Sequence, residues 1–231
     1  MLVLCNGMPR SASTWSYNVA MGLLRRAGGG RYVYGSYDED VAHFIAAIPP
    51  NIGHAVLKCH ILDSVGHALV ELRACRVIFT WRDPADAAVS FMRMFNHDFD
   101  HSLSVMKSSL ELYRFHRHSG NAAILKYDDI MAQPAESIER IAMYLGLGAT
   151  AAAIKQVAEE TSFERMRERA EKLNERRDDP NLIKMPDTTY DPETLLNLNH
   201  IRDGSSGYGA GQLAPDQLVR INRLREEFAR A

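Results

Sequence analysis

The sequence predicts a three-layer α/β sandwich with a central parallel β-sheet. Short apolar runs alternate with longer segments of helical periodicity, which is the pattern of β-α units. The apolar runs are nearly continuous, as expected for strands covered on both faces. With 231 residues, 46% of them hydrophobic, the chain is long enough for one sizeable core, and we expect a single domain over residues 1–231.

The elements follow one another in a regular order. We expect strands near 2–6, 54–60, 75–80 and 122–126, and a further strand or an extended loop over 31–37. Helices are expected at 13–27, 63–72, 84–95, 102–117 and 134–145, the first ended by three glycines at 28–30. The charged stretch 164–179 indicates a solvated helix face. Residues 178–200 contain three prolines and indicate an irregular segment that could cover a site. Residues 215–231 predict an amphipathic helix.

The first strand runs directly into a tight loop and a helix start at residues 6–15. Such a junction directs backbone N–H groups and the positive end of a helix dipole at one point, which favours an anion. Counted from Gly7, the loop departs from the nucleoside triphosphate loop, because Ala12 replaces its second glycine and Ser13 its lysine. Arg10 supplies a cation inside the loop instead. The pattern indicates a phosphate site without a metal; an ordinary strand-to-helix turn capped by hydroxyls is the alternative.

Residues 9–15 (Pro-Arg-Ser-Ala-Ser-Thr-Trp) resemble the 5′-phosphosulfate loop of sulfotransferases that use 3′-phosphoadenosine 5′-phosphosulfate (PAPS). The resemblance implies the P-loop NTPase-like sulfotransferase fold, with PAPS as donor, 3′-phosphoadenosine 5′-phosphate (PAP) as product and no metal. It also implies that the donor is bound by Arg10, Ser11, Ala12, Ser13, Thr14 and Trp15.

Residues 81–90 resemble the segment of this family that holds the 3′-phosphate. The resemblance assigns that phosphate to Arg82, after a strand, and to Ser90, eight residues on. An arginine fork suits a terminal phosphate dianion. Asp83 is placed to cap the following helix, so a helix cap with a surface arginine is the alternative interpretation.

Residues 201–207 resemble the Arg-Lys-Gly loop that closes over the 3′-phosphate in this family. Arg202 and Gly204 match that pattern, whereas Asp203 stands where the family has a lysine. A flexible Gly/Ser loop would give the same composition.

Two further segments resemble the adenine pocket of the family. They are residues 125–129, with Tyr127, and residues 161–164, with Thr161 and Phe163. Together with Trp15, these aromatic rings would contact the purine. Thr161 and Glu164 also have the spacing of a capping box for the helix that follows.

The catalytic residues are expected at 55–60, where a strand enters a loop. Side chains alternate along a strand, so Lys58 and His60 share a face and Cys59 points the other way. By resemblance to the family's Lys-Thr-His triplet, His60 is the general base, and a pKa of about 6.5 would suit it. Lys58 and Arg10 would stabilise charge on the transferring group and the leaving oxygen. An ordinary loop histidine is the alternative for His60.

The resemblance implies a sulfotransferase that moves a sulfonate to a hydroxyl or amine of a small-molecule acceptor. A P-loop small-molecule kinase and a catalytically inactive nucleotide-binding module are the alternatives. Aromatic residues in 31–50, 95–105 and 178–200 favour an apolar or aromatic acceptor. The identity of the acceptor and the oligomeric state stay open.

Composition argues against several other classes of protein. Acidic residues equal or exceed basic ones, which disfavours a nucleic-acid binder, and there is neither an 18-residue apolar stretch nor a signal-peptide pattern. Three cysteines (Cys5, Cys59 and Cys75) without C-x-x-C spacing disfavour disulfides and structural zinc, so we expect a cytoplasmic location. His97 and His101 lack a further ligand set for a metal, and we expect their segment to be a loop or part of the acceptor site.

Overall fold

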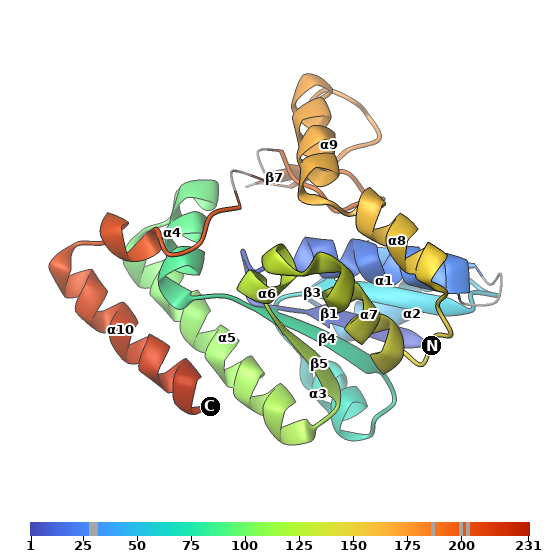
Figure 1. Cartoon of the computed structure of the whole chain (residues 1–231), viewed down its shortest axis with the longest axis horizontal. Helices are drawn as coiled ribbons and strands as arrows, with labels where there is room; N and C mark the ends of the chain where they lie inside the picture. Colours follow the sequence, from blue (N-terminus) through green and yellow to red (C-terminus); the bar gives the residue numbers. More distant parts are fainter. Residues whose placement is uncertain (28–31, 186–187, 199–200, 202–203) are drawn as a thin grey trace.

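The computed structural model describes residues 1–27, 32–185, 188–198, 201 and 204–231. Its centre is a five-stranded sheet in the order β2-β3-β1-β4-β5 (Figure 1), and every pair of neighbouring strands is parallel. The predicted parallel sheet is confirmed, and the segment expected as a strand or extended loop is the edge strand β2. The strands are β1 (Leu2–Asn6), β2 (Val33–Tyr37), β3 (His54–Cys59), β4 (Arg76–Trp81) and β5 (Ala122–Lys126).

Helices cover both faces of the sheet and complete the predicted three layers. One face, through residues such as Val3 and Val56, packs on α1 (Ser13–Ala27), α7 (Pro134–Tyr144) and α8 (Ala151–Glu160). The other face, through Leu4 and Leu57, packs on α2 (Val41–Ala47), α3 (Ser64–Glu71) and α5 (Phe99–Ser119). Alternate residues of one strand therefore enter two separate cores, as the pleat requires.

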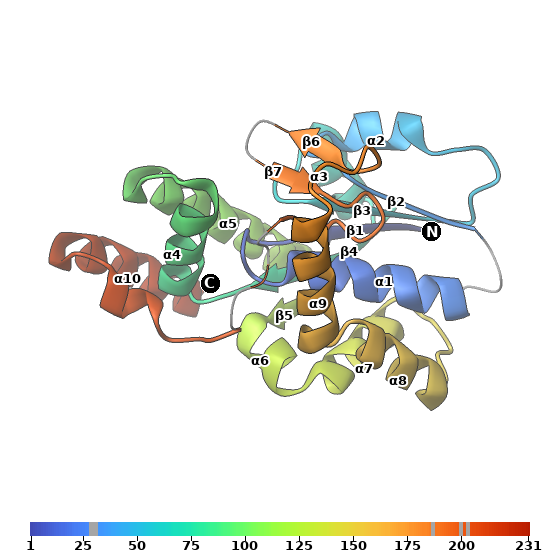
Figure 2. The same cartoon turned by 90° about the horizontal axis from the view of Figure 1, so that it is seen from above.

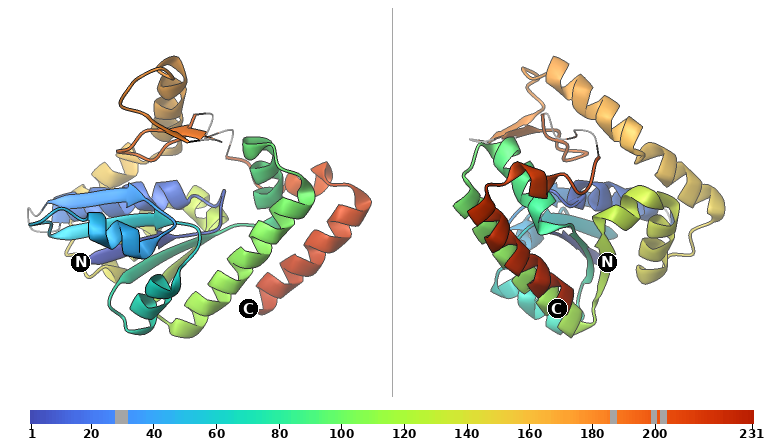
Figure 3. Two further views of the ribbon diagram at one scale, coloured as in Figure 1. Left: turned by 180° about the vertical axis from the view of Figure 1, so that it is seen from behind. Right: turned by 60° about the vertical axis from the view of Figure 1, so that its left-hand side comes forward.

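The C-terminal helix α10 (Pro215–Arg230) lies along α5 (Figure 3) and next to α4 (Pro84–Phe95). Its apolar face buries Ile221, Leu224 and Phe228, which confirms the predicted amphipathic helix. The short 3₁₀ helix η1 (Gly209–Gln212) packs on α4 and carries the chain from the loop at 204–208 into α10.

One helix and two short strands outside the three layers cross over the carboxyl edge of the sheet. Figure 2 shows α9 (Phe163–Glu175) and the strands β6 (Ile183–Met185) and β7 (Thr188–Tyr190) lying above the strand ends. A small cluster of Met166, Leu173 and Leu196 packs this layer together. Residues 178–200 are therefore not wholly irregular, because they contain an antiparallel hairpin.

Three local expectations were wrong, each because a cap residue was misassigned or a short helix missed. Asp98 accepts a hydrogen bond from His101 N at 2.8 Å and starts α5 at Phe99, so the loop expected at 97–101 is confined to residues 97–98. Ser162 caps α9 by accepting from Arg165 N, whereas Thr161 ends α8, so the predicted capping box is not formed. The short helices α2, α6 (Tyr127–Ala132) and α8 were not predicted. The glycines at 28–30 lie outside the described residues.

Candidate active site

A cavity of about 410 Å³ opens at the carboxyl edge of the sheet, where ligands of parallel α/β folds bind. It brings together most of the predicted site residues from segments far apart in the sequence. Ser11 does not line it, and Arg202 lies outside the described residues. The predicted residues that line it are Arg10, Ala12, Ser13, Thr14, Trp15, Lys58, His60, Arg82, Ser90, Tyr127, Thr161, Phe163 and Gly204.

The loop after β1 is held against β4 by close packing. A Cβ on Gly7 would lie 2.4 Å from Thr80 Oγ1, so only glycine fits there. Ser11 Oγ lies 2.6 Å from the Met8 carbonyl oxygen and 2.9 Å from Thr80 Oγ1, so this hydroxyl serves the loop instead of the cavity. Its predicted contact with the donor would have to use the backbone.

The backbone of this loop alternates between positive and negative φ angles, as in an anion-binding nest. Arg10 and Ala12 have positive φ angles of 66° and 72°, separated by Ser11, which is not in that region. Residues of alternating hand turn successive N–H groups to one side, the geometry of phosphate-binding loops. The cost of about 1–2 kcal/mol for a non-glycine residue in this region explains why glycine is usual at the position of Ala12.

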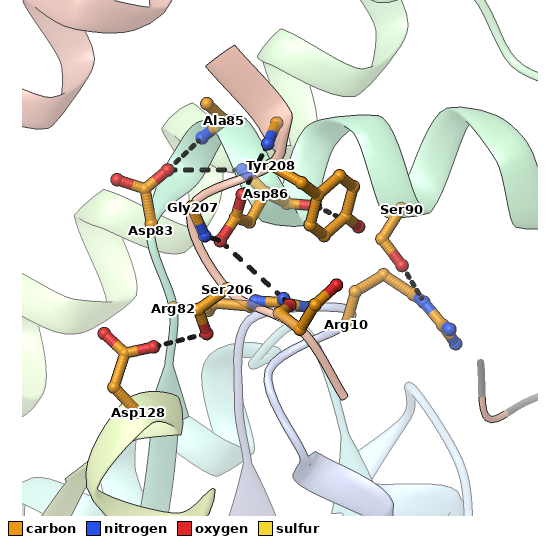
Figure 4. Close-up of polar contacts among 12 residues, drawn as sticks. Arg10, Arg82, Asp83, Ala85, Asp86, Ser90, Asp128, Ser206, Gly207 and Tyr208 are labelled. Carbon is orange, nitrogen blue, oxygen red and sulfur yellow. Dashed lines mark hydrogen bonds and ion pairs between the residues drawn. The ribbon is translucent and has the colours of Figure 1, made fainter. Parts of the chain in front are cut away.

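Arg82 emerges from the end of β4 into the cavity and is only 5% exposed. Its guanidinium stacks over the Tyr127 ring at 4.0 Å and donates from Nη2 to the Ser205 carbonyl oxygen. It also lies 3.7 Å from the Asp86 carboxylate (Figure 4). Its Nε is buried and has no hydrogen-bond partner among the described residues. A buried charged donor without a partner is costly, so this atom is suited to an anionic ligand.

Asp86 holds the loop at 204–209 and was not predicted from the sequence. Its buried carboxylate accepts hydrogen bonds from Gly207 N and Gly209 N, each at 2.7 Å (Figure 4). Asp128 accepts a further bond from Ser206 Oγ at 2.7 Å. In the sequence, Asp86 has the signature of an ordinary acidic residue in the first turn of a helix, and only the tertiary structure places the distant loop on it.

Gly204 brings this loop against the predicted adenine pocket. Its φ is +72°, and a Cβ there would lie 2.9 Å from Met131 Cε and 3.0 Å from Phe163 Cε2. The position therefore requires glycine for both its backbone angle and its close approach to the Phe163 ring.

Arg10 and Ser90, predicted for opposite ends of the donor, contact each other directly. Arg10 Nε donates to Ser90 Oγ at 3.0 Å (Figure 4). The Arg10 charge also lowers the pKa values of Lys58 and His60, although burial has a larger effect on both. The Arg10 side chain thus joins the loop after β1 to Ser90 on α4.

Lys58 and His60 lie on one side of the chain, as predicted, and the structure joins them in a hydrogen-bonded pair. Lys58 Nζ lies 3.0 Å from His60 Nε2, while His60 Nδ1 lies 2.6 Å from the Gly7 carbonyl oxygen. Since a carbonyl only accepts, this network assigns the proton to Nδ1, and Nε2 accepts from the ammonium. Cys59 is buried in the core on the opposite side.

The expectation that His60 titrates near 6.5 was wrong. Burial, reinforced by the neighbouring Lys58 charge, lowers the pKa of His60 to about 4. Burial likewise lowers the pKa of Lys58 to about 8, against the opposing influence of Glu39. At neutral pH the pair therefore consists of a neutral imidazole and an ammonium.

Thr14, in the first turn of α1, also lines the cavity, and its buried Oγ1 is a second donor that finds no partner among the residues described. The chemistry of the site thus fits an anion near the start of α1 and another near Arg82. Among the described residues no cluster of three His, Cys, Asp or Glu side chains is arranged for a metal ion. None of the helices described combines the length and apolar character that crossing a bilayer requires.

The family described as "Sulfotransferase domain" matches residues 37–181 of the chain. This range includes Arg82, Ser90 and Phe163, whereas the loop at 9–15 precedes it. Cytosolic sulfotransferase 17 of Arabidopsis thaliana is 23% identical over 209 residues, which are 76% of this chain and 55% of that protein. Cytosolic sulfotransferase 16 of the same plant is 22% identical over 180 residues, 66% of this chain and 50% of that protein. The chain spans about half the length of these relatives.

Solved structures show the same fold. The mouse sulfotransferase SULT7A1, complexed with PAP, superposes with a TM-score of 0.69 at 18% identity, covering 100% of this chain and 85% of that one. Retinol dehydratase in a complex with retinol and PAP gives a TM-score of 0.67 at 15% identity, covering 98% of this chain and 80% of that one. With the family match covering more than half of the sequence, the chain belongs to the sulfotransferase family.

Proposed function

We propose that the protein transfers a sulfonate group from PAPS to a hydroxyl or amine of a small-molecule acceptor. One observation carries this proposal: two buried donors, Arg82 Nε and Thr14 Oγ1, have no partner among the described residues and belong to residues lining the cavity that Lys58 and His60 also line. Because both sides of the cavity are needed, we propose that residues 1–231 act as one sulfotransferase domain.

The residues of the cavity match the parts of the donor. The nest at 10–12 and the start of α1, with Ser13 and Thr14, would bind the 5′-phosphosulfate, because N–H groups and the helix dipole converge there. Arg82 and Ser90 would bind the 3′-phosphate. The purine would lie among the rings that line the cavity, those of Trp15, Tyr127 and Phe163.

The donor supplies a sulfonate whose S–O bond to phosphate breaks as a bond to the acceptor forms. On the protein side, the unprotonated Nε2 of His60 is the atom that would take the acceptor's proton. In this structure Lys58 donates a hydrogen bond to His60 Nε2. The Lys58 ammonium must therefore turn toward the transferring group before Nε2 can accept a proton. Arg10 would add positive charge beside the leaving oxygen, and such fixed charges stabilise a transition state without reorganisation.

The surroundings of His60 favour an apolar or aromatic acceptor. Phe95 and Leu196 line the same cavity, and Tyr37 lies with its ring centroid 6.2 Å from that of His60. Among the structural relatives, retinol dehydratase has been solved with retinol and with androsterone, both apolar molecules. We propose a cytoplasmic protein, in keeping with the names of the Arabidopsis relatives.

Calorimetric titration with PAP, with ATP plus Mg²⁺ as the comparison, tests this function. We expect PAP to bind without metal and ATP weakly, because Ser13 stands where a nucleotide kinase needs lysine. Arg82→Ala should abolish most of the PAP affinity. Preference for ATP with Mg²⁺ would favour a kinase, and PAP binding without transfer to any screened acceptor would favour an inactive nucleotide-binding module.

A further inference from the structure

Glu39 lies beside the catalytic pair but comes from a different strand. In the β2–β3 register Tyr37 is opposite Lys58, and Asp38 N continues the ladder by donating to the Lys58 carbonyl oxygen at 3.2 Å. Glu39 follows β2 and lies alongside the backbone that leaves β3 at His60. Its carboxylate meets that backbone where the strand-to-strand hydrogen bonds stop.

The Glu39 carboxylate fixes two parts of the site at once. Its Oε2 accepts from His60 N at 2.8 Å and from Ile61 N at 3.0 Å. Its Oε1 accepts from the Tyr37 hydroxyl at 2.7 Å. Charge-assisted hydrogen bonds of this kind are about twice as strong as neutral ones, so one side chain sets the direction in which His60 leaves the sheet.

The Glu39 charge also favours the ammonium form of Lys58, a side chain that is only 7% exposed. The Tyr37 ring, held by Glu39, lies 4.7 Å from Lys58 Nζ and contributes a cation–π contact. The other groups that influence Lys58 are Arg10, which opposes its charge, and the thiols of Cys5 and Cys59. Among these charged and titratable groups Glu39 has the largest influence, and it favours the ammonium.

We propose that Glu39 is a positioning residue of the Lys58–His60 pair: it orients His60 through the backbone N–H groups of His60 and Ile61, and it supplies a negative charge that stabilises the buried Lys58 ammonium. The catalytic consequence rests on the proposed sulfotransferase function. The electrostatic consequence can be measured without any turnover.

The electrostatic test compares Glu39→Gln with the wild type by NMR of lysine labelled with ¹³C at Cε. The chain has six lysines, and Lys58→Arg assigns the signal. Glutamine keeps the size of the side chain and its oxygen acceptor but removes the charge. We expect the midpoint of the Lys58 titration to fall by about one pH unit. Asp38→Asn is the matched control, because Asp38 binds His43 at 2.6 Å and should leave Lys58 unchanged.

The kinetic test uses Glu39→Ala, Glu39→Gln and Asp38→Asn with PAPS and an acceptor. Loss of both hydrogen bonds and charge in Glu39→Ala should lower kcat by about 100-fold, the effect of a small displacement of a catalytic group. The affinity for PAP should stay within about twofold, because Glu39 does not line the cavity. Glu39→Gln should recover much of kcat at low pH and lose activity at a lower pH than the wild type.

Two results would overturn the proposal. One is an unchanged Lys58 titration in Glu39→Gln together with a wild-type pH profile. The other is a parallel loss of PAP affinity and thermal stability in Glu39→Ala, which indicates a merely structural side chain. If the wild type neither binds PAP nor transfers sulfonate, the proposed function fails, while the Lys58 titration still decides the role of Glu39.

Discussion

Thr14 offers a test in which stability and ligand binding change in opposite directions. Thr14 lies in the first turn of α1 and lines the cavity, and its buried hydroxyl has no hydrogen-bond partner in the part of the chain that the structure describes. Thr14→Val keeps the shape of the side chain and removes only the hydroxyl's polar atoms. If the hydroxyl exists to bind a phosphate or sulfate oxygen, its loss should help the free protein and harm the complex.

The two magnitudes follow from the environment of the hydroxyl. Burying an unpaired hydroxyl costs about 1–3 kcal/mol, so Thr14→Val should raise the free energy of unfolding of the free protein by about 1 kcal/mol. For a chain of 231 residues this corresponds to a Tm about 2–4 °C higher. A hydrogen bond to a charged group contributes about 1.5–3 kcal/mol, so the Kd for PAP should rise about 10- to 150-fold.

The assay is thermal unfolding without ligand, combined with calorimetric titration of PAP. Thr150→Val is the matched control: this hydroxyl caps α8 by accepting from Ala153 N at 3.2 Å, and Thr150 does not line the cavity. The control should lose about 1 kcal/mol of stability and change the Kd for PAP by less than about threefold. A Thr14→Val protein that is less stable than the wild type, or that binds PAP with unchanged affinity, would refute the assignment of Thr14.

Three further predictions concern the Lys58–His60 pair, the loop at 204–209 and the loop after β1. The pH profile of kcat/KM should be bell-shaped, because His60 is an unprotonated base above its pKa of about 4 and activity should fall as pH rises through the Lys58 pKa of about 8. An acid limb near pH 6.5 would contradict the buried environment of His60. Asp86→Ala should lower the free energy of unfolding by about 3 kcal/mol in urea titrations and weaken PAP binding, because it removes two bonds to the loop at 204–209 and a charge facing a buried arginine. Gly7→Ala should cost about 2 kcal/mol in the same urea assay, because its Cβ would meet Thr80 Oγ1, and wild-type stability would contradict this packing.

The strands and the start of α4 could be predicted because their signals are local. Apolar runs gave β1 and β5 with their observed bounds, and Asp83 followed by a proline gave the start of α4, where Asp83 accepts from Ala85 N and Asp86 N. The short helices α2 and α6 were missed because so few residues carry little periodicity. The β6–β7 hairpin was missed because three-residue strands do not stand out among prolines and charges.

Most residues of the candidate site could be proposed from motifs, but their protonation states could not. The pKa values of Lys58 and His60 depend on how completely the fold withdraws them from water, which no sequence pattern states. Asp86 and Glu39 were missed because each acts on backbone N–H groups of a distant segment.

The sequence by itself determined the β-α order and pointed to the loop after β1 as a proposed anion site, because both depend on neighbours within a few positions. Tertiary structure decided which of the proposed site residues share one cavity, which donors lack partners among the described residues, and which carboxylates hold the backbone at His60 and the loop at 204–209. These properties depend on contacts between residues 20 to more than 100 positions apart, such as Glu39 with His60 and Asp86 with Gly209. Burial strengthens such contacts and sets the protonation of the groups that make them.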